Sequence, residues 1–159
     1  QDARLQRATH RLLDALRAWQ RQGDALACEE ALVQACGRLL ERHTTRPAAP
    51  NAPAVRLDHI RQRLADDLLH PPTLEELACE AGIGKFQLLR RFAALYGCTP
   101  HAFVQQQRAE RVRRWIRHGS SLADAAAAAG FADQPHMTRV FTRHFGFTPG
   151  AWQRASRAQ

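Results

Sequence analysis

The sequence predicts an all-α fold in which a long central helix joins two helix-turn-helix subdomains, preceded by a helical hairpin-like segment. Two segments, TLEELACEAGIGKFQLLRRF at 73–92 and SLADAAAAAGFADQPHMTRVF at 121–141, repeat one pattern about 48 residues apart. The stretch between them, 101–118, contains neither proline nor glycine. Apolar residues before residue 43 also recur at helical spacing. These three observations favour helices over most of the chain.

The two copies of the repeat share their scaffold positions. With one extra residue allowed in the second turn, the matching pairs are Leu74/Leu122, Ala78/Ala126, Ala81/Ala129, Gly82/Gly130, Arg90/Arg139, Phe92/Phe141, Gly97/Gly146, Thr99-Pro100/Thr148-Pro149 and Phe103/Trp152. A repeat of this length indicates one supersecondary unit that is used twice.

The N-terminal part predicts two helices. The first covers residues 3–21 and ends before Gly23, and Asp24 is a suitable N-cap for the second, which runs to about Arg42. The apolar stripe expected on the second helix consists of Leu32, Ala35, Cys36, Leu39 and Leu40. We expect these helices to bury their stripes only against each other, against a partner chain or against a missing N-terminal part. Residues 1–43 are therefore predicted to be an interaction or linker module.

A proline-rich stretch marks a domain boundary. Residues 44–53, TTRPAAPNAP, contain three prolines and few apolar side chains, which is typical of an extended linker. We expect 1–43 to be linker helices, 44–54 the linker and 55–159 the next domain. The chain begins at Gln1 rather than Met, which suggests a fragment with a missing N-terminal part.

Helix boundaries can be predicted through the rest of the chain. Apolar spacing predicts a helix from Val55 to Leu68 that stops before two prolines. Thr73 with Glu76 forms a capping-box pattern, Ser121 with Asp124 is a looser version of it, and Asp133 is a candidate N-cap. Residues 101–118 should form one helix that fixes the separation of the two units. Two such units enter one face of DNA only when they lie about 34 Å apart.

The second helix of each unit has two different faces. Gly82 and Gly130 permit the tight turn before it, and the apolar Ile83 and Phe131 should pack beneath that turn. The i, i+4 pairs Leu88/Phe92 and Met137/Phe141 should face the core. The opposite face is expected to carry Phe86, Leu89 and Arg90 with Lys85 and Gln87 at its flanks in the first unit, and Gln134, Pro135, Thr138, Arg139 and Thr142 in the second.

These exposed residue types suit duplex DNA. Arg and Gln make bidentate hydrogen bonds to base edges in the major groove, and Phe, Leu and Thr methyl groups contact the thymine methyl. Structural alternatives remain open: Arg90 and Arg139 as solvated charges, Phe86 as a core residue, and His136 as a structural side chain rather than a phosphate ligand. Arg108, Arg111 and Arg114 fit either phosphate contact or a solvated helix face.

The charge is distributed unevenly. The chain has a net charge of +8, but residues 51–84 contain three basic and six acidic side chains. From Lys85 onward there are twelve basic side chains against three acidic ones. The excess positive charge begins with the second helix of the first unit and favours a polyanionic partner, most commonly nucleic acid.

Composition argues against several other classes of protein. No apolar run approaches the length of about 18 residues that spans a bilayer, and arginines interrupt every candidate signal peptide. We therefore expect a cytosolic protein that acts at the nucleoid, without a membrane partner. Cysteines at 28, 36, 79 and 98 lack metal-ligand or disulfide spacing and are predicted to be small buried hydrophobes. No metal, cofactor or catalytic site is expected.

The segment GFADQPHMTRVFTRHFGFTP at 130–149 resembles the C-terminal signature of the AraC/XylS family of bacterial transcription regulators. The spacing to TLEELA at Thr73 and to GIGKFQLLRRF at 82–92 is similar as well, so the resemblance covers about residues 55–155. It implies a seven-helix domain that binds two adjacent major-groove segments and contacts RNA polymerase. The DNA-facing positions that it implies are Phe86, Leu89, Arg90, Gln134, Pro135, Thr138 and Arg139.

Some positions depart from the family pattern. Gly84 replaces the usual Ser or Thr cap, Leu89 stands where a polar side chain is common, and Pro135 stands where Ser is frequent. Met137 replaces a frequent aromatic core residue. These differences bear on which bases are contacted, not on the fold.

Two other functions compete with a DNA-binding regulator. Alkylation-response proteins carry this type of domain beside a methyl-accepting cysteine, but that chemistry needs an activated thiolate, and the cysteines here are scattered. A protein-interaction module with a basic face that binds an acidic partner is the other alternative.

Overall fold

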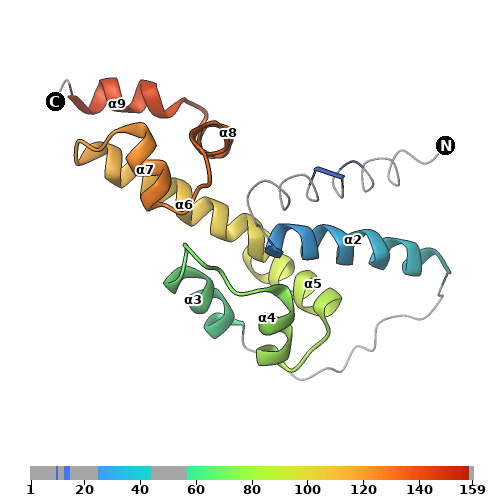
Figure 1. Ribbon diagram of the computed structural model, residues 1–159. Helices are drawn as coiled ribbons and strands as arrows, with labels where there is room; N and C mark the ends of the chain where they lie inside the picture. The colour runs from blue at the N-terminus through green and yellow to red at the C-terminus, as the bar shows by residue number, and fades with distance from the viewer. Residues whose placement is uncertain (1–9, 11–12, 15–24, 44–56, 158–159) are drawn as a thin grey trace. The chain divides into compact units, whose positions relative to one another are not determined.

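The computed structural model describes residue 10, residues 13–14, residues 25–43 and residues 57–157, with the side chains of 38–43 left aside. This described part forms helices and contains no strand, which confirms the predicted all-α fold (Figure 1). The helices are α2 (Ala25–His43), α3 (Asp58–Asp66), α4 (Leu74–Ala81), α5 (Lys85–Tyr96), α6 (Pro100–Arg117), α7 (Leu122–Ala128), α8 (Gln134–Phe145) and α9 (Pro149–Arg157). The predicted helix at 3–21 and the linker at 44–54 lie outside the described residues, apart from three positions.

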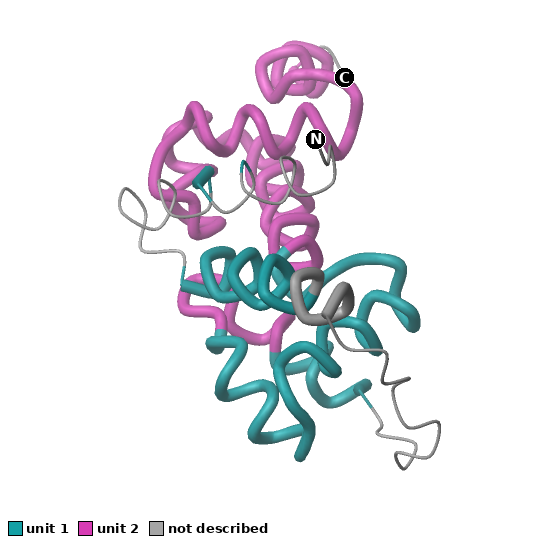
Figure 2. Tube along the Cα trace, turned by 90° about the vertical axis from the view of Figure 1, so that its right-hand side faces the viewer, with its two compact units in different colours: residues 1–63, 72–101 teal, residues 64–71, 102–159 magenta. Residues whose placement is uncertain are grey.

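The chain divides into two compact units, coloured separately in Figure 2. Unit 1 comprises residues 1–63 and 72–101, and unit 2 comprises residues 64–71 and 102–159. Helix α6 is continuous from Pro100 to Arg117, as the absence of proline and glycine predicted. Each unit contains one copy of the sequence repeat, so each can be described by itself.

The core of unit 1 consists mainly of leucines, with Ile60 and Phe92. The predicted core pair of α5, Leu88 and Phe92, is fully buried. Other large apolar side chains of this unit that are at most 3% exposed are Leu26, Leu57, Ile60, Leu74, Leu77 and Leu89. Tyr96 at the end of α5 donates a hydrogen bond of 2.9 Å to Asp58 Oδ1 on α3, and burial, followed by this bond, raises the pKa of the phenol.

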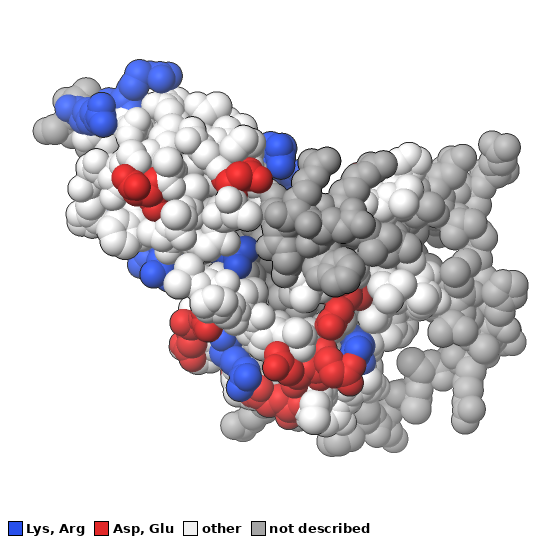
Figure 3. Space-filling model, viewed as in Figure 1, with Lys and Arg blue, Asp and Glu red and all other residues white. Residues whose placement is uncertain are grey.

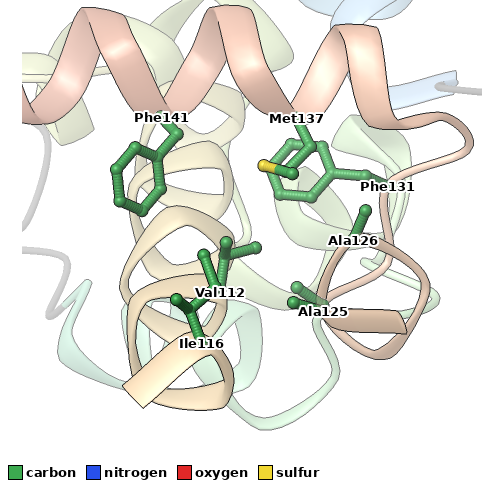
Figure 4. Close-up of a cluster of buried hydrophobic side chains, with 8 residues drawn as sticks. Val112, Ile116, Ala125, Ala126, Phe131, Met137 and Phe141 are labelled. Carbon is green, nitrogen blue, oxygen red and sulfur yellow. The ribbon is translucent and has the colours of Figure 1, made fainter. Parts of the chain in front are cut away.

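The core of unit 2 draws on three helices and one turn (Figure 4). Met137 and Phe141 of α8 are completely buried, as their spacing predicted. They pack with Val112 and Ile116 of α6, Ala125 and Ala126 of α7, Ala129, and Phe131 from the turn. The alanine side chains of α7 are short, which allows neighbouring helices to approach it closely. Burial of this kind stabilises by about 1.5–3 kcal/mol for each large side chain.

The caps predicted from sequence are present. Thr73 accepts a hydrogen bond from the Glu76 backbone and Glu76 accepts one from the Thr73 backbone, which completes a capping box on α4. The hydrogen bond that the Thr73 backbone donates to the Glu76 carboxylate, followed by one from the Thr73 hydroxyl, holds the pKa of Glu76 below its usual value. Ser121 caps α7, and Asp133 accepts a 2.6 Å hydrogen bond from His136 N at the start of α8. Gly84, at the N-cap of α5, contributes no side-chain hydrogen bond.

The helix predicted from Val55 to Leu68 is shorter in the structure. Helix α3 ends at Asp66, and Leu68 lies buried beyond it. Asp67 Oδ1 accepts backbone hydrogen bonds from Leu69 at 3.0 Å and from His70 at 2.8 Å. This aspartate turn competes with the helix for the backbone donors and terminates it before the two prolines.

The predicted apolar stripe of α2 was wrong at Leu32 and Cys36; Ala35 is half-buried, and the side chains of Leu39 and Leu40 lie outside the described residues. Leu32 is 49% exposed and Cys36 is exposed, whereas Leu26 is 2% exposed and Gly37 is buried. Helix α2 packs against α4 and α5 of its own unit, so its buried face is not reserved for a partner chain or a missing domain. Apolar spacing alone selected the wrong side because the true contact face carries an acid and a glycine.

The cysteine prediction was wrong too. Cys36 and Cys79 are exposed, while Cys28 and Cys98 are half-buried, and all four are free thiols. Each exposed one lies on the solvent side of its helix. Burial raises the pKa of the Cys98 thiol, which makes it a poorer nucleophile. In the described residues, no helix is long and apolar enough to cross a membrane.

Candidate nucleic-acid interface

The repeated sequence produces the same turn twice. In the first unit Ile83 N donates to Ala78 O at 3.1 Å, and in the second Phe131 N donates to Ala126 O at 3.0 Å. Gly82 and Gly130 adopt positive φ angles of 65° and 85° at the matching positions. Helices α4 and α5, like α7 and α8, therefore form a helix-turn-helix in which the second helix carries the candidate binding residues.

Helix α8 presents its candidate residues to solvent. Gln134, Pro135 and Arg139 are exposed, and Thr138 and Thr142 are half-buried. Proline fits the first turn of this helix because its missing N–H would have no helical partner there. Gln134 and Arg139, which can bond to base edges, thus lie on an accessible face of α8, whereas the hydroxyl oxygen of Thr142 is buried.

Helix α5 differs from α8. Arg90 is exposed, but Lys85, Phe86 and Gln87 are half-buried. Lys85 forms an ion pair with Glu75 of α4, and this hydrogen bond raises the pKa of the lysine. The guanidinium of Arg90 lies 5.8 Å from the centroid of the Phe86 ring, a cation–π distance.

Leu89 does not lie on an open face. We expected it opposite the core stripe of α5, but it is only 3% exposed. Helix α5 packs against α2 as well as α4, and Gly37 of α2 lies against Phe86, three residues before Leu89, so we infer that α2 covers this side of α5. An isolated helix-turn-helix would leave this side of α5 free.

Arg108 has a structural role that the sequence did not reveal. Its side chain is 7% exposed, its Nε donates a 2.8 Å hydrogen bond to Leu68 O, and its guanidinium lies 6.0 Å from the Phe131 ring centroid. Neither a phosphate contact nor a solvated position fits this burial. Arg111 is half-buried and Arg114 is exposed on the same helix.

His136 packs within unit 2. Its ring meets Phe131 edge-on with centroids 5.4 Å apart, and its backbone N–H is taken by the Asp133 cap. These contacts favour the structural alternative considered for this side chain.

Charge separates by element, as the sequence distribution indicated. Figure 3 shows acidic side chains gathered over α3 and α4 and basic side chains over α9. Glu80 of α4 pairs with Arg63 at 3.4 Å, while the last turn of α9 carries Arg154 and Arg157. Helix α4 is thus an unfavourable surface for a polyanion, whereas the end of α9 favours one.

Comparison with known proteins identifies the domain. A family model described as a helix-turn-helix domain matches residues 77–155. The chain is 33% identical over 141 residues to the HTH-type transcriptional activator RhaR of Klebsiella pneumoniae, covering 86% of this chain and 49% of that relative. The DNA-binding domain of AdpA, solved in complex with a target DNA, is 26% identical with a TM-score of 0.58, covering 64% of this chain and 93% of that one.

A solved structure whose protein is described as containing an AraC-type DNA-binding domain is similar as well. This transcriptional regulator from Chromobacterium violaceum is 26% identical with a TM-score of 0.51, covering 65% of this chain and 88% of that one. The chain belongs to the AraC family. Relatives of this AraC-family chain are named as transcriptional regulators rather than enzymes. The chain spans about half the length of RhaR.

Proposed function

We propose that this chain is a sequence-specific regulator of transcription that inserts α5 and α8 into adjacent major-groove segments of a bacterial promoter. The observation that carries the proposal is the pair of helix-turn-helix units with equivalent turn hydrogen bonds. The likeness to AdpA, whose domain was solved with target DNA, supports the same role.

The residues proposed to contact DNA divide between the two helices. On α8 these are Gln134, Pro135, Thr138, Arg139 and Thr142. On α5 they are Lys85, Phe86, Gln87, Leu89 and Arg90. Arg90 and Arg139 occupy matching positions and are both exposed, which favours base contact in both units. The remaining positions differ in chemistry, so the two helices should prefer different bases.

The proposed partners of the chain, besides DNA, are RNA polymerase and a second copy of the chain. RNA polymerase is the expected protein partner of a promoter-bound activator. A homodimer through residues 1–43 or through a preceding domain would double the number of bound DNA segments. No cofactor is required for reading DNA, and the compartment proposed for the chain is the bacterial cytoplasm, where the nucleoid lies.

The salt dependence of binding tests the proposal. A duplex enriched from a random pool should bind with an affinity that falls with salt, with a log-log slope of roughly −0.9 for each phosphate neutralised. Fluorescence anisotropy at several salt concentrations measures this slope. Failure to enrich any duplex, together with tight capture of an acidic protein, would instead favour a protein-interaction module.

A further inference from the structure

Helix α2 makes specific hydrogen bonds to the first helix-turn-helix unit. Glu29 Oε2 accepts hydrogen bonds from Leu74 N at 2.7 Å and from Glu75 N at 3.3 Å. The Thr73–Glu76 capping box does not satisfy these two backbone donors at the start of α4. Since a helix N-terminus attracts negative charge, the carboxylate of Glu29 is well placed there.

The next residue of α2 caps a second helix. Glu30 Oε1 accepts a 2.6 Å hydrogen bond from His101 N, next to Pro100 at the start of α6. Glu30 is only 5% exposed, and a buried carboxylate is costly unless it has hydrogen-bond partners. Two adjacent acids that each cap a helix fix both the position and the direction of α2 on unit 1.

Further along α2, Gly37 lies directly on Phe86. A Cβ atom at residue 37 would stand 2.2 Å from Cε2 and 2.5 Å from Cδ2 of that ring. Glycine lowers helix stability relative to alanine, so its presence in the interior of α2 is explained by this close approach. Leu26, Glu30 and Gly37 thus form one buried face at spacings of four and seven residues.

Helix α2 packs on the side of α5 that we propose to contact DNA. Phe86 and Leu89 lie three residues apart on one side of α5, and both are among the residues proposed to face the major groove. Phe86 is half-buried with Gly37 against its ring, and Leu89 is 3% exposed. At the corresponding positions of α8, Pro135 is exposed and Thr138 is half-buried, so within the described residues this region of α8 is more open.

We propose that α2 is an intrachain cover for the DNA-reading face of α5, so that the first unit binds DNA only after α2 leaves. This inference rests on the proposed function. A major-groove helix must bring its side chains into contact with base edges, and a second helix packed on those side chains excludes the duplex. DNA and α2 therefore compete for one surface.

Competition between α2 and DNA links the apparent Kd to the population of the open form. When the open form is a small fraction of the population, the apparent Kd exceeds the intrinsic Kd by the reciprocal of that fraction. An open population of roughly one tenth would raise the apparent Kd about tenfold. By linkage, saturating DNA must raise the fraction of chains in the open form by the same factor.

Hydrogen exchange of the full chain tests this reciprocity. The probe is a duplex enriched from a random pool, added in saturating amount. Amides of Leu74 and His101, and those of α2, should exchange faster with DNA bound because they lose their partners and packing. Amides of α8 should be slowed or unchanged. Unchanged protection of α2 on a chain that is saturated with DNA overturns the inference.

A variant pair tests the cover directly. Gly37→Leu places bulk against the Phe86 ring, and Cys36→Leu places the same side chain at the neighbouring exposed position. Gly37→Leu should speed exchange of α2 and lower the Kd for the enriched duplex about tenfold, for the open fraction assumed above. Cys36→Leu should bind like the parent chain. If α2 is undocked in Gly37→Leu but the affinity for the enriched duplex does not rise, the inference is overturned.

The same measurements separate this inference from the proposed function. If the parent chain binds DNA and only the effect of undocking is missing, the cover is wrong and the regulator stands. If neither the parent nor Gly37→Leu with an undocked α2 enriches any duplex, the proposed function fails and the cover fails with it. Glu30→Gln, which keeps the shape of the buried cap but removes its charge, should weaken docking in the same direction as Gly37→Leu.

Discussion

Gly130 is constrained twice in unit 2. Its φ of 85° strains any other residue, and a Cβ atom there would lie 2.8 Å from Leu68 O, the carbonyl that accepts the Arg108 hydrogen bond. Gly146 has a similar φ of 81° but nothing within 4 Å of the added atom. Substitution of Gly146 should therefore introduce backbone strain alone, whereas substitution of Gly130 should introduce backbone strain and a steric conflict.

We predict that Gly130→Ala destabilises more than Gly146→Ala. Backbone strain should cost each variant about 1–3 kcal/mol, and displacement of the Leu68 carbonyl should add about 1 kcal/mol or more to Gly130→Ala. Urea unfolding of the two variants measures the difference in the free energy of unfolding. Equal losses would mean that the Leu68 contact contributes nothing.

Arg139 should contribute to the sequence preference of α8. Arg139→Ala is predicted to weaken binding to the enriched duplex by about 1–3 kcal/mol and to leave binding to random DNA almost unchanged. Arg143→Ala, an exposed charge in the last turn of the same helix, is the matched control and should affect both duplexes alike. Competition binding on both duplexes measures this, and equal losses for Arg139→Ala would assign that residue to the phosphate backbone.

Residues governed by local chemistry were predictable. Asp133 caps α8, and Met137 with Phe141 fills the core, because both roles follow from spacing within one helix. Leu89 and Arg108 were not predictable, because their burial depends on segments distant in sequence. Arg108 bonds to a carbonyl 40 residues earlier, and no local pattern marks that contact.

At the level of elements, the capping box of α4 makes stability depend on pH. The pKa of Glu76 is lowered in the folded chain, chiefly by the Thr73 backbone hydrogen bond. Its contribution is therefore fully present above the unfolded pKa and is lost as the pH falls through the folded one.

Glu76→Gln tests this dependence. Between neutral pH and about pH 4.3, the usual value for a glutamic acid, the parent should keep its full capping contribution. Below that pH the parent should lose stability more steeply than Glu76→Gln, because only the parent must protonate this carboxylate. Thermal unfolding from pH 7 to pH 3 measures both chains, and parallel curves would contradict the expected role.

Helix α2 shows why elements are easier to predict than their surfaces. Its extent, residues 25–43, agrees with the expected helix to within a residue or two. Its contact face does not, because Glu29 and Glu30 are attracted by two helix N-termini that exist only in the folded unit. Apolar periodicity reports burial by the hydrophobic effect and does not detect capping between helices.

At the level of the whole molecule, the repeat is one scaffold with two different surfaces. The turn glycines, the core phenylalanines and the turn hydrogen bonds coincide in the two units. Apart from the matching Arg90 and Arg139, the proposed DNA-facing residues differ, and among the described helices α2 packs against α5. A single chain should therefore recognise an asymmetric site.

Selection of bound duplexes from random DNA, carried out with the parent chain and with Arg139→Ala, tests this asymmetry most directly. The parent should enrich two dissimilar base clusters with centres about 10 base pairs apart, one helical turn of DNA. Arg139→Ala should lose the preference in one cluster and keep the other. Two identical clusters, or the loss of both preferences together, would contradict asymmetric recognition by two distinct helices.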